Sequence, residues 1–247
     1  MAGTEKKRLD VWLVERGLAG SREAARRLVM AGQVRVNDQP AVKPGASIPA
    51  DARIETLGTA EPYVSRGGRK LRAALDHFQI DPTGAVALDI GASTGGFTDC
   101  LLQAGAARVY AIDVGHNQLH WKIRSDPRVI VREKVNARAL DESQAPELVD
   151  GVVIDVSFIS VAKILDPVVA RMKPGAWLIV LAKPQFEVGP SEVGKGGIVR
   201  DPELHRRVVD DVSRALAERG LAVRGIIQSP ILGADGNKEF LIAATRQ

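Results

Sequence analysis

The stretch V-A-L-D-I-G-A-S-T-G-G-F-T, from Val86 to Thr98, decides the fold of most of this chain. Its apolar start predicts a buried strand that ends near Asp89, and the glycines after it allow a tight turn and a close approach of the backbone to a ligand. The dinucleotide-binding pattern G-x-G-x-x-G needs a second glycine where this sequence has Ser93. We therefore expect a nucleotide-like cofactor that has no pyrophosphate to seat on the helix N-terminus. A dehydrogenase and a plain strand-to-helix turn are the alternatives.

The spacing Asp-x-Gly-x-x-x-Gly resembles the first motif of Rossmann-like methyltransferases, in which the aspartate lies beside the methionyl end of S-adenosylmethionine. The resemblance implies that this cofactor is bound by Asp89, Gly91, Ala92, Ser93, Gly95, Gly96 and Phe97. Asp113 ends the next apolar segment, near the spacing at which such folds place a carboxylate on two ribose hydroxyls. A cap on the following turn is the alternative for Asp113. Asn136 follows the third apolar segment, where these enzymes frame the adenine.

From Ala85 onward, apolar segments alternate with helical patterns, which predicts an α/β fold with an open, mostly parallel sheet. The resemblance implies that this fold is of the Rossmann-like methyltransferase type. Seven strands are expected near residues 85–90, 108–114, 128–132, 151–156, 176–182, 222–228 and 239–244. Ligands of such sheets bind at the carboxyl ends of the strands, where Asp155 and Lys183 also fall. Glu239 opens the last strand and reaches that edge only if this strand runs antiparallel to its neighbours. A reversed last strand distinguishes the methyltransferase sheet from the dinucleotide-binding one.

The positive charge of the chain is concentrated in its first third. Residues 1–75 hold 14 Lys and Arg against 8 Asp and Glu, whereas residues 76–247 hold 20 against 22. This asymmetry suggests a polyanionic partner, with nucleic acid as the first candidate, and a merely solvated basic face is an equally good interpretation of the charge alone. We expect residues 1–60 to form a small α+β domain of two helices and short strands, residues 61–84 a basic linker and helix, and residues 85–247 the catalytic domain.

The pattern R-L-D-x-W-L-x-x-R-G-L-A-x-S-R, continued by L-V-x-x-G-x-V-x-V-N and K-P-G, resembles the alpha-L RNA-binding domain of a small-subunit ribosomal protein and of several RNA-modifying enzymes. The resemblance implies that the two helices present a basic face to the RNA backbone, since structured RNA is recognised mostly by shape and phosphate. The residues expected on that face are Arg8, Arg22, Arg26, Arg27 and Lys43, and the linker adds Arg66 and Arg69.

Four residues, Lys70, Asp155, Lys183 and Glu239, resemble the Lys-Asp-Lys-Glu tetrad of the heat-shock-type (FtsJ-like) RNA ribose 2′-O-methyltransferases. Together with the segments S-R-G-G-R-K-L, D-V-S-F-I-S and K-P-Q-F-E, they resemble the TlyA (hemolysin A-like) family of ribosomal RNA methyltransferases. The resemblance covers residues 6–245 and implies cytidine 2′-O-methylation of ribosomal RNA in ribosomal subunits. A structural ion pair is the alternative for Asp155 and Lys183.

The reaction explains why such residues would be needed. A ribose 2′-hydroxyl is a poor nucleophile near neutral pH, so its attack on a sulfonium methyl group needs a base within hydrogen-bond reach. We assign Lys183 as that base and Lys70 as the cation that orients the hydroxyl and stabilises the developing oxyanion. Asp155 is assigned as the acceptor that holds the lysines, and Glu239 as the residue that positions Lys70 or the ribose.

Other classes fit the sequence less well. A base N-methyltransferase would use Asp155-Val156-Ser157-Phe158 like an Asp-Pro-Pro-Tyr loop, but both prolines are absent. A membrane-lytic protein would need an amphipathic or spanning segment, and none is evident, while a protein that only binds RNA would not need the tetrad. The single Cys100 allows no disulfide, and no metal site is expected. We expect a cytoplasmic protein that requires no membrane and no evident protein partner.

Overall fold

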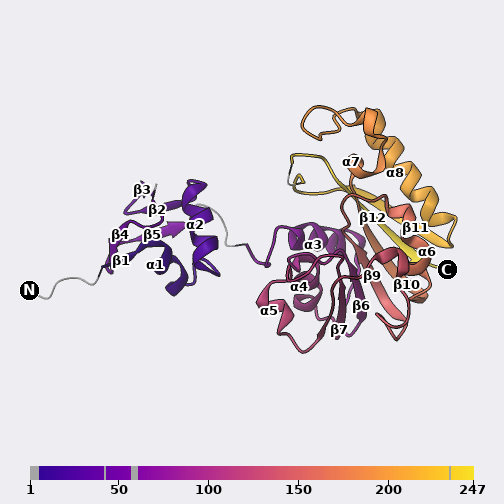
Figure 1. Ribbon diagram of the computed structural model, residues 1–247, viewed down its shortest axis with the longest axis horizontal. Coiled ribbons are helices and arrows are strands. Elements are labelled where there is room, and N and C mark those ends of the chain that lie inside the picture. Colours follow the sequence, from indigo (N-terminus) through magenta and orange to yellow (C-terminus); the bar gives the residue numbers. More distant parts are fainter. Residues whose placement is uncertain (1–5, 42, 57–60, 234) are drawn as a thin grey trace, which may run out of the picture. The chain divides into compact units, whose positions relative to one another are not determined.

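The computed structural model describes residues 6–41, 43–56, 61–233 and 235–247. The chain divides into two compact units, residues 1–62 and residues 63–247 (Figure 1). Each unit has a hydrophobic core of its own.

The first unit is a small α+β structure built on a pair of helices. Its elements are β1 (Lys6–Arg8), α1 (Leu9–Glu15), α2 (Arg22–Met30), β2 (Val34–Val36), β3 (Gln39–Pro40), β4 (Ser47–Pro49) and β5 (Ile54–Thr56). β1 pairs with β4, and β2 lies between β3 and β5. The Ser21 hydroxyl caps α2 by accepting a hydrogen bond of 3.1 Å from the Ala24 amide. Leu9 and Leu13 of α1 pack against Ala25 and Val29 of α2, which makes a core of the size expected for so short a unit.

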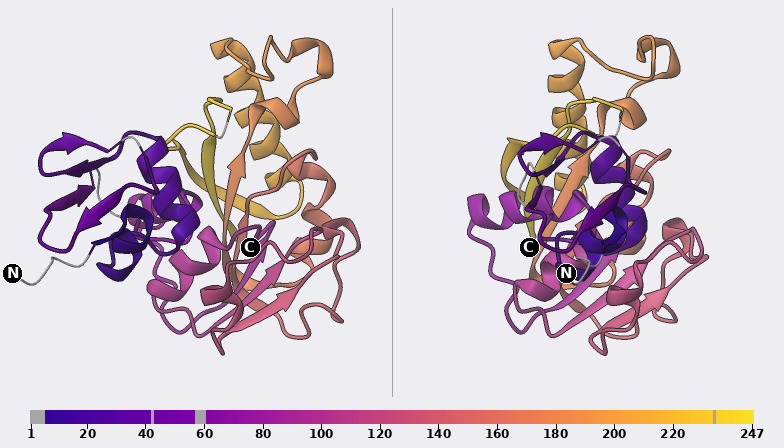
Figure 2. Two further views of the ribbon diagram at one scale, coloured as in Figure 1. Left: turned by 60° about the vertical axis from the view of Figure 1, so that its left-hand side comes forward. Right: turned by 90° about the vertical axis from the view of Figure 1, so that its left-hand side faces the viewer.

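The second unit contains the predicted seven-stranded sheet. Its strands are β6 (Val86–Ile90), β7 (Arg108–Ile112), β8 (Val129–Arg132), β9 (Val149–Ile154), β10 (Met172–Ala182), β11 (Leu221–Gln228) and β12 (Phe240–Arg246). Their order in the sheet is β11-β12-β10-β9-β6-β7-β8. The last strand, β12, runs antiparallel to both of its neighbours, as predicted, and lies beside β10 (Figure 2). One detail differs from the expectation, because β10 begins four residues earlier, at Met172, and contains a bulge between Met172 and Trp177.

Helices cover both faces of this sheet. They are α3 (Gly67–Phe78), α4 (Gly96–Gln103), α5 (Trp121–Arg124), α6 (Leu165–Val169), α7 (Pro184–Glu187) and α8 (Pro202–Ala217). α3 and α4 lie on one side of the sheet, and α6 and α8 on the other (Figure 1). Alternate residues of one strand therefore enter different cores: Leu178 faces α6 and α8, whereas Ile179 faces α3 and α4. This double coverage explains why the strands are apolar on both faces.

No helix in the described ranges has the length and apolar character that a membrane crossing requires.

Replacement of Leu178 by Ala should destabilise the second unit by about 2–5 kcal/mol, because the side chain is fully buried in the middle of β10 and its removal leaves a cavity. Leu148→Ala is the matched control, since Leu148 is 40% exposed. Chemical denaturation of the two variants measures the difference. Equal losses of stability would show that the core described above does not carry the fold.

Candidate active site

A cavity of about 490 Å³ lies at the carboxyl ends of β6, β7 and β9. Its polar lining includes Ser93, Asp113 and Asn136, and its apolar lining includes Ile112, Val135 and Ile159. A cavity of this volume is in the range of sites for small organic ligands, with apolar walls and a few polar groups. It is therefore the candidate site for a nucleoside-containing cofactor.

The glycine loop forms one wall of this cavity. Gly91 has a φ of +85°, and a Cβ atom added to it would come within 2.4 Å of the Asp155 carbonyl oxygen. Ser93 has a φ of +48°, and Gly95 precedes α4 with a φ of +97°. The loop thus lies directly against the segment that follows β9, and a side chain at position 91 would force the two apart.

The Asp113 carboxylate is fixed by two backbone amides. Ser93 N–H donates to Oδ2 at 2.7 Å, and Gly115 N–H donates to Oδ1 at 2.6 Å. Each carboxylate oxygen keeps a further lone pair, so Asp113 can accept hydrogen bonds from two ribose hydroxyls at the cavity wall. Asn136 also lines the cavity, with its Oδ1 accepting from the Arg138 amide at 3.0 Å. The expected contact of Asn136 with an adenine stays a prediction.

Asp89 lies beneath the loop. Its side chain is fully buried, and Asp89 is not among the described residues that line the two cavities. Oδ2 accepts a hydrogen bond of 2.6 Å from the Thr98 hydroxyl, whereas none of the described residues donates one to Oδ1. Burial raises the pKa of Asp89 to about 7. The structure thus gives Asp89 a role in holding α4 against β6, and the direct cofactor contact expected from the sequence stays a prediction.

A second cavity, of about 280 Å³, adjoins the first and shares Gly91, Ser93, Asp155 and Ser157 with it. The four tetrad residues all line this second cavity: Lys70, Asp155, Lys183 and Glu239. Lys70 comes from α3, Asp155 follows β9, Lys183 follows β10, and Glu239 precedes β12. Only the reversed direction of β12 brings the start of that strand to the carboxyl edge of the others.

The tetrad forms two ion pairs. The Lys70 ammonium contacts the Glu239 carboxylate, and the exposed fractions of these side chains are only 10% and 3%. Lys183 Nζ lies 2.6 Å from Asp155 Oδ1 and donates to the Ser157 hydroxyl at 3.0 Å. Each lysine of the cavity is thus paired with its own carboxylate, which offsets the free-energy cost of removing the two ammonium groups from water. The sequence led us to expect that Asp155 holds both lysines. In the structure Asp155 pairs with Lys183, whereas Lys70 pairs with Glu239.

The loop before β12 fixes Glu239. Its backbone oxygen accepts from the Ser229 amide at 2.8 Å, and the Gly233 amide donates to the Asn237 oxygen at 2.9 Å. A Cβ atom on Gly233 would lie 2.6 Å from Glu239 Oε1. Position 233 therefore has room only for glycine while Glu239 keeps its place. No local pattern in the sequence connects Gly233 with Glu239, because the contact depends on how the loop folds back.

Phe158 is a further residue that the sequence reasoning missed as a site residue. It lines the first cavity, is 90% exposed and has a φ of +64°. Its ring lies 4.9 Å from that of Phe186, measured between centroids. A large aromatic side chain held in solvent at a strained backbone position is uncommon and suits contact with a ligand.

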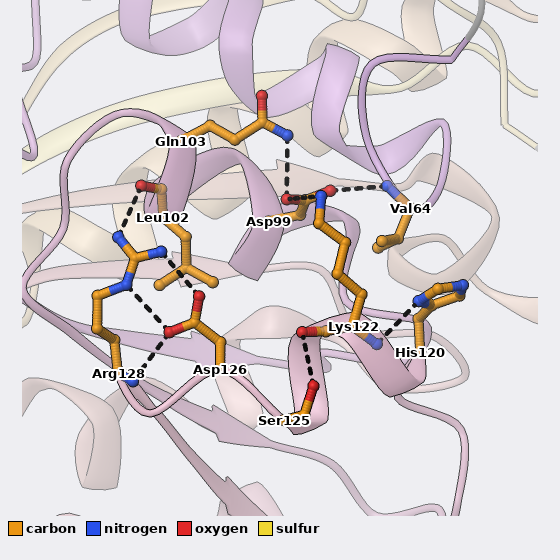
Figure 3. A network of polar contacts seen from close by, with 9 residues as sticks. All are labelled: Val64, Asp99, Leu102, Gln103, His120, Lys122, Ser125, Asp126 and Arg128. Atoms are coloured by element: carbon orange, nitrogen blue, oxygen red, sulfur yellow. Dashed lines mark hydrogen bonds and ion pairs between the residues drawn. The ribbon is translucent and has the colours of Figure 1, made fainter. Parts of the chain in front are cut away.

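A polar network around Asp99 fastens the helices that surround the site (Figure 3). The buried Asp99 carboxylate accepts from the Val64 amide at 2.8 Å and from Gln103 Nε2 at 3.0 Å, and lies 3.5 Å from Lys122 Nζ. Val64 precedes α3, Gln103 ends α4 and Lys122 lies in α5. The network therefore ties the helix that carries Lys70 to the helix that follows the glycine loop.

The residues expected to bind RNA are exposed, and they lie in both units: Arg8, Arg22, Arg26, Arg27, Lys43, Arg66 and Arg69. In the first unit, Arg8 and Arg22 contact the Asp10 carboxylate and Arg27 pairs with Glu23. In the second unit, Arg66 lines the cavity of the tetrad. Their contacts with RNA stay predictions.

The fold and the site agree with what comparisons with known proteins show. Residues 63–246 match the model of the FtsJ-like methyltransferase family. The chain belongs to this family. Residues 7–54 match the S4 domain model, which corresponds to the predicted alpha-L domain. The enzyme is therefore a methyltransferase with S-adenosylmethionine as its cofactor, as the glycine loop predicted, and the dehydrogenase alternative is wrong.

Relatives align over nearly the whole chain. The 16S/23S rRNA (cytidine-2′-O)-methyltransferase TlyA of Mycobacterium tuberculosis is 46% identical over 96% of this chain and 89% of its own length. Hemolysin A of Brachyspira hyodysenteriae is 40% identical over 95% of this chain and 98% of its own length. A solved structure from Streptococcus thermophilus, described as a candidate hemolysin, is 42% identical with a TM-score of 0.77, and the match covers 99% of this chain and 90% of that one.

The lining of the first cavity fits S-adenosylmethionine. The Asp113 carboxylate offers acceptors for the ribose diol, and the apolar wall around Ile112 and Val135 suits a purine ring. Asp113→Asn should weaken cofactor binding about 10- to 100-fold, because the amide loses a charged acceptor and turns a donor toward a backbone N–H. Isothermal titration with S-adenosylmethionine measures the effect. Asp126→Asn, which removes the same charge from the turn before β8, is the control, and equal affinities of the two variants would contradict the assignment.

Gly233→Ala should lower the kcat of methyl transfer about 10-fold or more, because the added Cβ displaces the Glu239 carboxylate from Lys70. Cofactor affinity should not change. Gly189→Ala is the control, since the nearest atom to a Cβ there is at 3.5 Å. A normal kcat in the Gly233 variant would show that the position of Glu239 does not matter for the reaction.

Proposed function

We propose that this protein transfers the methyl group of S-adenosylmethionine to the 2′-hydroxyl of cytidine in ribosomal RNA, within ribosomal subunits in the cytoplasm. The observation that carries the proposal is the tetrad at the second cavity, beside the cofactor cavity. Activation of a ribose hydroxyl requires a base and a cation, and the two lysines supply both. The names of two relatives support the same reaction, one that aligns over 96% of this chain and one that aligns over 73% of it.

The reaction is a direct displacement in which bound S-adenosylmethionine supplies an electrophilic methyl group. The 2′-oxygen forms the new bond to carbon as the carbon–sulfur bond breaks, and S-adenosylhomocysteine is the leaving group. The hydroxyl proton passes to Lys183 Nζ, which must first give up a proton of its own, and the Asp155 carboxylate at 2.6 Å is the acceptor within reach. Asp155 and Ser157 orient this amine by contacts of 2.6 and 3.0 Å. Lys70, held by Glu239, faces the negative charge that develops on the oxygen before the bond to carbon is complete.

The substrate is held by basic residues of both units. We propose that Arg8, Arg22, Arg26, Arg27 and Lys43 contact phosphates of folded RNA, and that Arg66 and Arg69 contact the strand near the target nucleotide. The exposed Phe158 lies at the cavity mouth, where a base turned out of its stack can lie on the ring. No contact of this set requires a second protein chain, and we propose that the enzyme acts without one.

Lys183→Ala should lower methyl transfer about 10²- to 10⁴-fold and leave cofactor affinity near normal, because the amine accepts the proton but lines only the tetrad cavity. Transfer of labelled methyl groups from S-adenosylmethionine to purified ribosomal subunits measures the rate, and titration measures the affinity. Lys173→Ala is the control, since Lys173 lies at the other end of β10 and pairs with Asp150 at 2.6 Å. Normal turnover of the Lys183 variant would refute its role.

The position of the label on the nucleotide tests the reaction itself. A ribose 2′-O-methyl group leaves an alkali-resistant dinucleotide, whereas a methyl group on the base does not. Recovery of the label in a dinucleotide supports ribose methylation. Recovery in a mononucleotide would establish the base N-methyltransferase instead, and no transfer to subunits would favour a protein that only binds RNA.

A further inference from the structure

An unexpected carboxylate lies among the basic residues of the first unit. Asp10, in the first turn of α1, is fully buried, yet its partners are two solvent-exposed arginines. Arg8 donates from Nε to Oδ1 and from Nη2 to Oδ2, both at 2.9 Å. Arg22, at the start of α2, donates from Nη2 to Oδ2 at 3.2 Å. One carboxylate thus joins guanidinium groups from β1 and from α2.

The two arginines keep most of their surface in water. The exposed fractions of the Arg8 and Arg22 side chains are 52% and 60%, against 0% for Asp10. Each guanidinium uses one edge for Asp10 and has donors left, because the group carries five N–H bonds. The hydrogen bond from Arg8 is the largest influence on the pKa of Asp10, and with help from Arg22 it outweighs the opposing effect of burial. The pKa is lowered to about 2, so the carboxylate is charged at neutral pH.

The backbone at Gly45 limits the position of the Arg8 guanidinium on a second side. The Asp10 amide donates to the Pro44 oxygen at 2.9 Å, and the Leu9 amide donates to the Ala46 oxygen at 2.8 Å. These bonds fix the segment at Gly45, where a Cβ atom would lie 3.2 Å from Arg8 Nη1 and 3.3 Å from Cζ. The Arg8 guanidinium therefore lies between the Asp10 carboxylate and the Gly45 backbone, in one orientation.

We propose that Asp10 is a positioning residue for RNA binding: it holds Arg8 and Arg22 as a preformed pair of guanidinium groups for the phosphates of folded RNA. This proposal rests on the proposed function, which supplies the RNA. Arginine side chains lose conformational freedom when they bind, and a fork already fixed in the free protein avoids that loss. The bidentate geometry of guanidinium with phosphate also requires a defined orientation.

If only net charge mattered, the Asp10 carboxylate would weaken RNA binding. A negative charge among arginines repels phosphate, so its removal should strengthen RNA binding if charge alone decides. If positioning decides, removal of the carboxylate should weaken binding although the protein becomes more positive. The sign of the change therefore separates the two explanations.

The test compares Asp10→Asn with Asp51→Asn, the same substitution at an exposed position of the same unit. The KM for purified ribosomal subunits and the kcat are measured with labelled S-adenosylmethionine, and the Kd for a short synthetic RNA duplex is measured over a range of salt concentrations. For Asp10→Asn we expect a KM raised about 5- to 10-fold with unchanged kcat. The dependence of log Kd on log salt concentration should become less steep by the equivalent of about one phosphate contact. Asp51→Asn should bind as tightly as the wild type or more tightly. Equal or tighter binding by Asp10→Asn would overturn the proposal.

Two further variants exclude loss of folding as the cause. Gly45→Ala leaves Asp10 in place and shifts the Arg8 guanidinium by a few tenths of an ångström, so it should raise the KM less than Asp10→Asn does, while the thermal unfolding temperature is unchanged. In a chain that already carries Arg8→Ala and Arg22→Ala, Asp10→Asn should have no further effect on the KM. An additional loss in that background would show that Asp10 acts on the fold and not through the arginines.

Failure of the positioning role of Asp10 and failure of the proposed function give different results. Methylation of subunits that depends on Lys183 but not on Asp10 would refute only the positioning role. Absence of any RNA binding or methyl transfer by the wild type would refute the proposed function itself.

Discussion

The directions of the strands, with β12 reversed, bring the charged groups of the site to one edge of the sheet. The parallel strands β6, β7, β9 and β10 bring their carboxyl ends to one edge of the sheet, and β12 brings its amino end to the same edge. Asp113, Asp155 and Lys183 come from the first set, and Glu239 comes from the second. Were β12 parallel to β10, Glu239 would lie at the far edge of the sheet and Lys70 would be a nearly buried charge without a carboxylate.

The two units divide the work of the enzyme. In the second unit each lysine of the tetrad is paired with a carboxylate, which leaves Arg66 as the exposed cation among the described residues that line the tetrad cavity. The first unit presents arginines whose charge is balanced only in part, by a carboxylate that is itself buried. Under the proposed function, affinity for RNA and activation of the hydroxyl depend on different residues, and the two units have separate hydrophobic cores.

The sequence predicted the sheet because its strands are short, apolar and separated by glycine or polar turns, and because the spacing from Asp89 to Asp113 is typical of one fold. It also predicted the reversed last strand from the position of Glu239. It did not predict which carboxylate pairs with which lysine, since that depends on the directions of α3 and of the loop before β12. Asp89 shows another limit: the motif marks its place after a strand, but burial against Thr98 is a property of the packed core. Gly233 and the exposed ring of Phe158 depend on loop conformation, which no local periodicity specifies.

Lys70 and Glu239 stand 169 residues apart in the chain, on the first helix and beside the last strand of the second unit. Contacts between such distant positions form late, because the whole intervening chain must be ordered before they are favourable. A ribosome that synthesises this protein releases β12 after the other elements of the second unit, and until then Glu239 is not in place to pair with Lys70. A chain that stops before Glu239 cannot assemble the tetrad, even if its first unit is folded. The ion pair can therefore form only once the segment that leads into β12 has joined the rest of the second unit.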